Sequence, residues 1–553
     1  MYQQHLIEQL LRDQWSFLKL SASFFSIAVV AMLVDLITIL FAGSISQAHL
    51  DGVGLADTLF SLMMISTSNG YSTVFDTYGP QVYGSTERNE IGTVLVKCLL
   101  QGSLINIIML GPFLNSVYLI DVMPGSLTES SASPDEYREI AVQYIRLIAV
   151  VGFLDYAIAM ISNYFAIQGH SKHVYIISVI MIACHVLANY VFISTLNMNV
   201  IGLGLASIIG RIIPLMISIA ICTVKIRSKE FIWTGFSLNV LLGWGPMMML
   251  GVSGAVDCVA ELALFELSSF FSQFDGTTTF SVVIIIVQLL NVCYAFGEGV
   301  SRAGANMIGS ALGDGSVKAV KRYMVLTILN SLAESTLLAI TCFPLGNNFV
   351  KLFNPGQEVI DLFDGNLWLV CISIAAYHFQ YGLTQGILVA FGNQRFIAWS
   401  KSIACYCVGL PVVIVTIFFM DLRVIGVISG CIVSDLINIT AALYKISKID
   451  IEKEIEIAKV RTKAESFQDT GYALIKGIEN MMLNSEDNEP SSPNDGWTLT
   501  NFDEEDDTDD EKRSVLESNS VNYLNHEMKN VLASFLISTI ICILLAGISF
   551  FKK

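Results

Sequence analysis

The sequence predicts an all-α polytopic membrane protein built from two pseudo-symmetric six-helix bundles, and three observations predict it. Of the 553 residues, 54% are hydrophobic and 14% are charged, whereas a soluble globular protein carries about 25% charged residues. Twelve apolar runs reach about 20 residues, the length at which a helix spans a bilayer. Short motifs also recur about 223 residues apart, which is the length of six such runs.

The composition also excludes several classes of protein. A mean hydropathy of +0.62 excludes a soluble enzyme, and the hydrophobic content excludes a disordered chain. The net charge of −17 excludes a nucleic-acid-binding protein, which needs a basic face. The 11 cysteines all lie in apolar runs without the spacing of a metal site, so neither a metal centre nor a disulfide framework is expected.

The expected spans follow one another with short polar connections. They lie near residues 21–43, 53–78, 94–120, 138–167, 173–196, 200–224, 242–272, 277–308, 322–346, 362–390, 397–420 and 424–446, with a thirteenth near 530–551. The resulting domains are an N-terminus (1–19), an N-lobe (20–226), an inter-lobe loop (227–241), a C-lobe (242–447), an acidic segment (448–528) and the thirteenth span (529–553).

Basic residues are concentrated in alternate connections, which predicts the orientation of the chain. On one side lie Arg88, Lys172, Lys225, Arg227, Lys229, Lys318, Lys321, Arg322, Arg395, Lys401, Lys445 and Lys448, against Arg138, Lys351 and Arg423 on the other. The positive-inside rule then places the N-terminus and the acidic segment in the cytoplasm. The expected location is the plasma membrane, with a vesicle or vacuole membrane as the alternative.

Most of the net charge lies in one segment. Residues 448–528 carry 21 acidic and 8 basic side chains, a net charge of −13 out of −17. A helix is expected at about 448–466, followed by a solvating, disordered linker at about 482–526. The rest of the chain is therefore a nearly neutral membrane body.

Four short motifs repeat in the same order, each with an offset near 223 residues. Val200-Ile201-Gly202 recurs as Val424-Ile425-Gly426, and Gly84-Ser85 recurs as Gly309-Ser310. Gly169 recurs as Gly392, and Ile182-Ala183-Cys184 recurs as Ile403-Ala404-Cys405. Because six spans are an even number, both halves enter the membrane from the same side, as in parallel-repeat transporters. Two such lobes predict a central cleft that opens to either side in turn.

Ionisable residues at bilayer depth are costly and point to function. Asp257 and Glu261 are four residues apart and share one helix face, whereas Glu266 lies about 140° further round. Two carboxylates close together in a partly dry site do not both stay ionised, so a proton or a cation must neutralise one. At an effective dielectric constant of about 20, a cation about 4 Å from a carboxylate gains about 4 kcal/mol. This competition is the physical basis of a proton/cation exchanger.

Several of these groups have a structural alternative. Glu298 and Arg302 are four residues apart and either neutralise each other or serve the site. Asp155 is expected to pair with Arg146 or with a neighbouring helix, and His185 to make a satisfied polar contact.

At these residues the sequence resembles the multidrug and toxic compound extrusion (MATE) family, in particular its eukaryotic branch, over residues 20–447. The matching pieces are Phe75-Asp76-Thr77, Gln81-Val82-Tyr83-Gly84, Leu187-Ala188-Asn189-Tyr190-Val191-Phe192, Gly202 to Ala206, Glu261 through Phe265-Glu266, Gly309-Ser310-Ala311-Leu312-Gly313-Asp314, Gly392-Asn393-Gln394 and Val408-Gly409-Leu410-Pro411. The resemblance implies a V-shaped pair of lobes and export of organic cations in exchange for protons rather than sodium.

The resemblance also implies which residues form the site. The acidic pair of span seven corresponds to Glu261 and Glu266, and an aromatic residue one helix later corresponds to Tyr294. We expect these to act with Asp257, Glu298 and Phe265, and with the N-lobe polar residues Asp35, Asp76, Gln81 and Asn189. The chain departs from the family where Gln288 and His378 replace glutamates. The expected partners are small organic cations, protons and membrane lipid, for a monomer without a cofactor.

Other functions fit the sequence less well. A flippase of lipid-linked molecules from the same superfamily would need basic residues in its cleft to bind phosphate, and the intramembrane balance here is acidic. A membrane enzyme lacks any supporting motif, such as a nucleophile elbow. A non-transporting receptor or scaffold, with the acidic segment as its binding surface, stays open as an alternative.

Overall fold

The computed structural model describes residues 2–121, 134–232, 240, 243–353, 356–420 and 422–463. All the regular elements in these ranges are helices. The thirteenth span expected near 530–551 and the linker expected at 482–526 lie outside the described residues.

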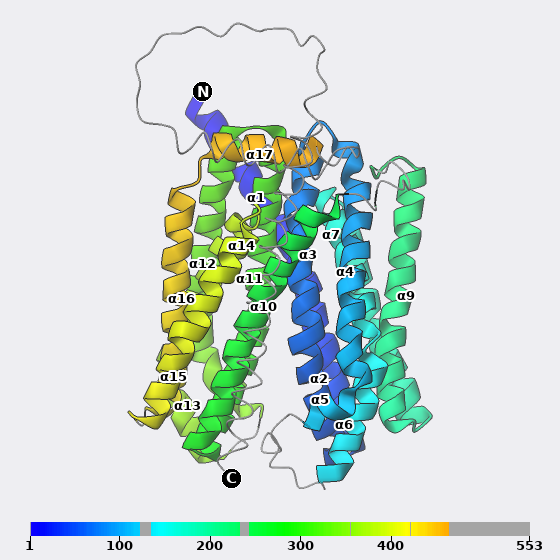
Figure 1. The fold of residues 1–553 in the computed structure, drawn as a ribbon, viewed down its shortest axis with the longest axis vertical. Helices are drawn as coiled ribbons and strands as arrows, with labels where there is room; N and C mark the ends of the chain where they lie inside the picture. Colours follow the sequence, from blue (N-terminus) through cyan, green and yellow to red (C-terminus); the bar gives the residue numbers. More distant parts are fainter. Residues whose placement is uncertain are drawn as a thin grey trace, which may run out of the picture.

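The first half of the chain forms the N-lobe (Figure 1). Its helices are α1 (Tyr2–Ile45), α2 (Gln47–Phe60), α3 (Ser66–Gly84), α4 (Ile91–Leu114), α5 (Ser116–Asp121), α6 (Pro134–Ile148), α7 (Val151–Ile167), α8 (Ser171–Asn189) and α9 (Asn199–Arg227). Helices α2 and α3 are joined without a break by a π-helical turn at Ser61–Ile65. A second π-helical turn, Tyr190–Thr195, extends α8.

The second half forms the C-lobe. Its helices are α10 (Trp244–Ser272), α11 (Thr277–Asp314), α12 (Val317–Lys351), α13 (Gln357–Tyr381), α14 (Gln394–Ser402), α15 (Leu410–Phe418), α16 (Arg423–Ser447) and α17 (Ile451–Lys463). The π-helical segment Gly382–Leu388 extends α13, and Ile403–Gly409 joins α14 to α15. The helix expected at 448–466 is present as α17.

The twelve expected spans of the two lobes are confirmed, and one of them is bent. Eleven described helices are long and apolar enough to cross a membrane, and a twelfth span consists of α6 and α7, which meet at 42°. The span expected near 138–167 is thus present as a bent pair of helices. Just after the bend, α7 packs so closely on the π-helical turn that a Cβ atom at Gly152 would lie 2.4 Å from Met64.

Backbone geometry confirms the internal repeat. Gly169 and Gly392 end the fourth and tenth spans with φ angles of 79° and 74°. Asn199 and Arg423 begin the sixth and twelfth spans, each with a φ of 47°. Positive φ is uncommon for residues other than glycine. The two halves therefore use the same unusual turns at matching positions.

The lobes touch along α3, which packs against α10 and α11. The backbones approach so closely that a Cβ atom at Gly70 would lie 2.3 Å from the carbonyl oxygen of Gly254. Nearer the end of α3, a Cβ atom at Gly313 would lie 2.0 Å from the oxygen of Gln81. In Figure 1 the ribbons of the two lobes meet at the end of the molecule that carries α17 and diverge toward the opposite end.

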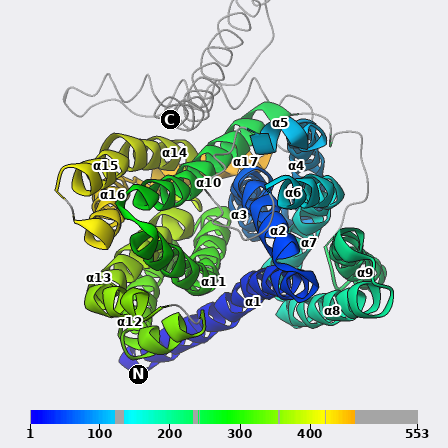
Figure 2. The same cartoon turned by 90° about the horizontal axis from the view of Figure 1, so that it is seen from below.

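Two further elements join the lobes at the same end. Helix α1 starts beside α12 and crosses into the N-lobe (Figure 2), with Gln14 bonded to Asn330 at 2.8 Å. Helix α17 buries Ile455 and Ala458, and the guanidinium of Arg461 donates to the Gln81 side chain on α3 at 2.9 Å. At the end at which they meet, the lobes are therefore held together by α1 and α17 as well as by the packing along α3.

Candidate functional site

Asp257 and Glu261 lie together in the C-lobe, as their spacing on α10 predicts. The ammonium of Lys401, from α14, contacts the Glu261 carboxylate and lies 3.5 Å from Asp257. The Tyr377 hydroxyl of α13 donates to Glu261, and the Gln385 amide donates to Asp257 at 2.6 Å. These five residues from three spans form what we call the C-lobe polar group.

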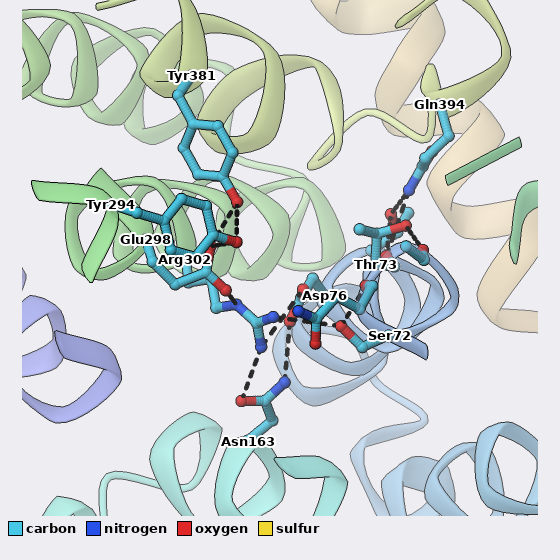
Figure 3. A network of polar contacts seen from close by, with 12 residues as sticks. Ser72, Thr73, Asp76, Asn163, Tyr294, Glu298, Arg302, Tyr381 and Gln394 are labelled. Carbon is cyan, nitrogen blue, oxygen red and sulfur yellow. Dashed lines mark hydrogen bonds and ion pairs between the residues drawn. The ribbon is translucent and has the colours of Figure 1, made fainter. Parts of the chain in front are cut away.

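A second group lies between the lobes (Figure 3). The Arg302 guanidinium on α11 pairs with Glu298, one turn earlier, at 2.5 Å. It also reaches the N-lobe, where it donates to the Ser72 hydroxyl at 3.2 Å and the Asn163 side chain at 3.3 Å. The Asp76 carboxylate is 3.9 Å from the guanidinium. The pairing of Glu298 with Arg302 is thus observed, and the same arginine also connects the two lobes.

Tyrosines complete this interlobe polar group and link it to the C-lobe polar group. The Tyr381 hydroxyl donates to Glu298 at 2.5 Å and lies 3.0 Å from the Tyr294 hydroxyl. The Tyr377 and Tyr381 rings stack with centroids 6.0 Å apart. Polar and aromatic contacts therefore run from Lys401 in the C-lobe to the N-lobe helices α3 and α7.

A third group lies within the N-lobe. The Arg211 guanidinium on α9 pairs with Asp155 at 2.9 Å and lies 3.7 Å from Asp35. Asp155 was expected to pair with Arg146 or with a neighbouring helix, and it pairs with Arg211 of the neighbouring helix α9. His185 makes polar contacts through Nε2, 2.9 Å from Thr38 and 3.1 Å from the amide of Asn189, whereas its buried Nδ1 has no hydrogen-bond partner among the described residues.

The other predicted site residues are distributed around these groups. Phe265 packs edge-on against Tyr377, with centroids 6.0 Å apart. His378 is buried and lies 2.9 Å from Glu334 of α12. Glu266 and Gln288 are exposed on α10 and α11, and Glu266 takes no part in the hydrogen bonds described for the C-lobe polar group. Gln81 donates to the Ala390 carbonyl at 2.8 Å and so ties α3 to the C-lobe.

Sequence reasoning missed several members of the site. Lys401 was counted among the basic residues at span ends, but its side chain turns inward and is only 3% exposed. Tyr377, Tyr381 and Gln385 lie one helical turn apart along the tenth span. That spacing is the one signal in the sequence that could have identified them as one functional face.

The three groups share one charge pattern. Each has a single basic side chain facing two carboxylates: Lys401 with Asp257 and Glu261, Arg302 with Asp76 and Glu298, and Arg211 with Asp35 and Asp155. With all members ionised, each group carries one negative charge more than its base can neutralise. A buried surplus charge is costly, so the groups around Lys401 and Arg302 can each take up one further cation or proton. In the Arg211 group the Asp35 side chain is exposed, which makes its surplus charge less costly.

Comparison with known proteins decides the family. The model of the MatE family matches residues 23–191 and 255–415, which is more than half of the chain. The chain belongs to the MatE family. It is therefore a multi-pass membrane transporter and not an enzyme.

Relatives of this MatE protein confirm its resemblance to the eukaryotic branch. It is 24% identical over 447 residues to human multidrug and toxin extrusion protein 1, covering 80% of this chain and 76% of the relative. It is 26% identical over 470 residues to rabbit multidrug and toxin extrusion protein 2, covering 83% and 74%. Its fold matches the crystal structure of the eukaryotic MATE transporter AtDTX14 with a TM-score of 0.75 and 17% identity, covering 82% and 99% of the two chains.

Proposed function

We propose that this MatE transporter exports organic cations in exchange for protons by alternating access. The names of its relatives describe multidrug and toxin extrusion. The observation that carries the proposal is the surplus carboxylate in each polar group. An acidic surplus attracts positive substrates and leaves a carboxylate that a proton can neutralise in their place. The expected orientation places α17 and the end at which the lobes meet in the cytoplasm, with the plasma membrane as the expected location.

The aromatic side chains suit an organic cation. Tyr294, Tyr377, Tyr381 and Phe265 surround the carboxylates of Glu261 and Glu298. A ring face attracts a cation by about 0.5–2 kcal/mol, with the larger values in dry surroundings. Aromatic contacts tolerate many shapes, so a site of this kind accepts a class of organic cations rather than one compound.

The interlobe polar group supplies the coupling. While Asp76 and Glu298 are ionised, Arg302 holds α11 to α3 and α7, which keeps the lobes together at the α17 end. Protonation of Asp76, the carboxylate on the N-lobe side, weakens its attraction to Arg302 and makes parting of the lobes at this end less costly. Proton binding is thereby linked to the side of the membrane on which the cleft between the lobes is open. A cation and a proton also compete for the same negative charge.

Flux of a quaternary ammonium ion in proteoliposomes tests the proposal. With the purified full chain in vesicles that start with tetraethylammonium on both sides, an acidic interior should drive uptake of the ion above its equilibrium level. Dissipating the pH gradient with a protonophore should remove that accumulation. Saturable equilibration that a pH gradient never drives uphill would contradict proton exchange, and a matching response to a sodium gradient would assign sodium as the coupling ion.

A further inference from the structure

Lys401 resembles a transported cation in what it touches. A primary ammonium on a flexible alkyl chain sits between the two carboxylates of Asp257 and Glu261, and the three side chains are 3%, 3% and 14% exposed. The Gln385 amide and the Tyr377 hydroxyl occupy the remaining carboxylate oxygens. An organic cation that enters the C-lobe polar group meets carboxylates already bound to a positive group of the protein itself.

The lysine is held by attraction to the carboxylates and can be exchanged. Its four-carbon side chain is flexible, and an ammonium is a compact point charge with rotatable donors rather than a rigid fork. Asp435 of α16 is a further buried acid within electrostatic range of both Lys401 and Glu261. It gives the displaced ammonium a second negative partner, so Lys401 need not be left unpaired when another cation takes its place.

We propose that Lys401 is a tethered competitor at the cation site. Its ammonium occupies Asp257 and Glu261 when no transported cation is bound, and an incoming cation must displace it. Lys401 would thus determine the specificity of the site, because only ligands that gain more than a bare ammonium, through aromatic contacts or a second charge, bind well at low concentration. The inference rests on the proposed function for its substrate, an organic cation.

Tethering makes the competition strong. A group attached by a short flexible linker acts at an effective concentration in at least the millimolar range. Removing the charge of Lys401 should therefore lower the concentration of tetraethylammonium that half-saturates the site by about tenfold or more.

Equilibrium binding of radiolabelled tetraethylammonium to the purified full chain, measured from pH 5.5 to 9, tests this proposal. K401M should bind about tenfold or more tightly than the unchanged protein at the alkaline end. K401R keeps the charge, on a fork that pairs with carboxylates at least as well as an ammonium does, and should bind no more tightly than the unchanged protein. The exposed Lys318, near the start of α12, gives the surface control, K318M, which should change nothing.

A charge-balanced double variant provides a control for misfolding caused by an unpaired buried charge. D257N/K401M removes one acid together with the lysine, so it leaves no additional unpaired charge in the buried site. It should bind tetraethylammonium more tightly than D257N alone, in which the lysine stays on Glu261. Equal binding by K401M, K401R and the unchanged protein, or no binding by any of them, would overturn the proposal. A protein that shows this order of affinities but no flux driven by pH would instead overturn proton exchange.

Discussion

The variant R302M is expected to reduce cation transport at least a hundredfold. Arg302 carries the contacts that join Glu298 of α11 to Ser72, Asp76 and Asn163 of the N-lobe. Removing the base leaves two buried carboxylates without a positive partner, and breaking a buried pair in this way costs about 3–5 kcal/mol. Initial rates of tetraethylammonium flux in proteoliposomes, normalised to the amount of folded protein, measure the effect.

Two further variants separate transport from stability. E298Q/R302M removes both charges of the pair on α11, so its melting temperature should recover toward that of the unchanged protein while transport stays low. R227M, at an exposed arginine near the end of α9, should leave both properties unchanged. Normal flux in R302M, with the protein intact, would show that this arginine does not couple the lobes.

The variant E261Q is expected to abolish cation flux driven by a pH step. Glu261 holds the one carboxylate that touches both Lys401 and Tyr377. A glutamine keeps the shape but binds neither a cation nor a transferable proton. Loss of about 4 kcal/mol of attraction to a cation corresponds to about a thousandfold in affinity, so flux at submillimolar substrate should fall to background.

The control for this substitution is E456Q, on the exposed face of α17, where the carboxylate pairs with Lys459. It makes the same chemical change outside the polar groups and should keep full flux. E261Q protein that responds to the pH step as strongly as E456Q, at equal amounts in the membrane, would remove Glu261 from the mechanism.

The fold could be predicted from the sequence because its determinants are local. Hydrophobic length places each span, and the helical period brings Asp257 and Glu261 to one face. The same period places Glu298 one turn before Arg302, which is the pair observed at 2.5 Å. The bend between α6 and α7 was missed because the apolar run of residues 147–154 continues through it, so hydrophobic length alone does not reveal it.

The partners of the acids could not be predicted, because they come from distant parts of the chain. Lys401 lies 140 residues from Glu261, and Arg302 lies 230 residues from Ser72. Composition also does not show which way a lysine near a span end points. Its alkyl chain lets the ammonium reach either the membrane surface or an acid inside the protein. Counting Lys401 as a surface charge therefore concealed the tightest ion pair of the C-lobe polar group.

The central claim is that a cation and a proton exchange at the same carboxylates, and proton movement driven by a cation tests it most directly. Proteoliposomes loaded with tetraethylammonium, and with equal pH on both sides, are diluted into medium without it while a trapped dye reports the internal pH. The account predicts that the interior acidifies as the cation leaves, that this signal saturates with substrate, and that it is absent in E261Q. Exit of the cation without any acidification, with the membrane potential clamped, would contradict it.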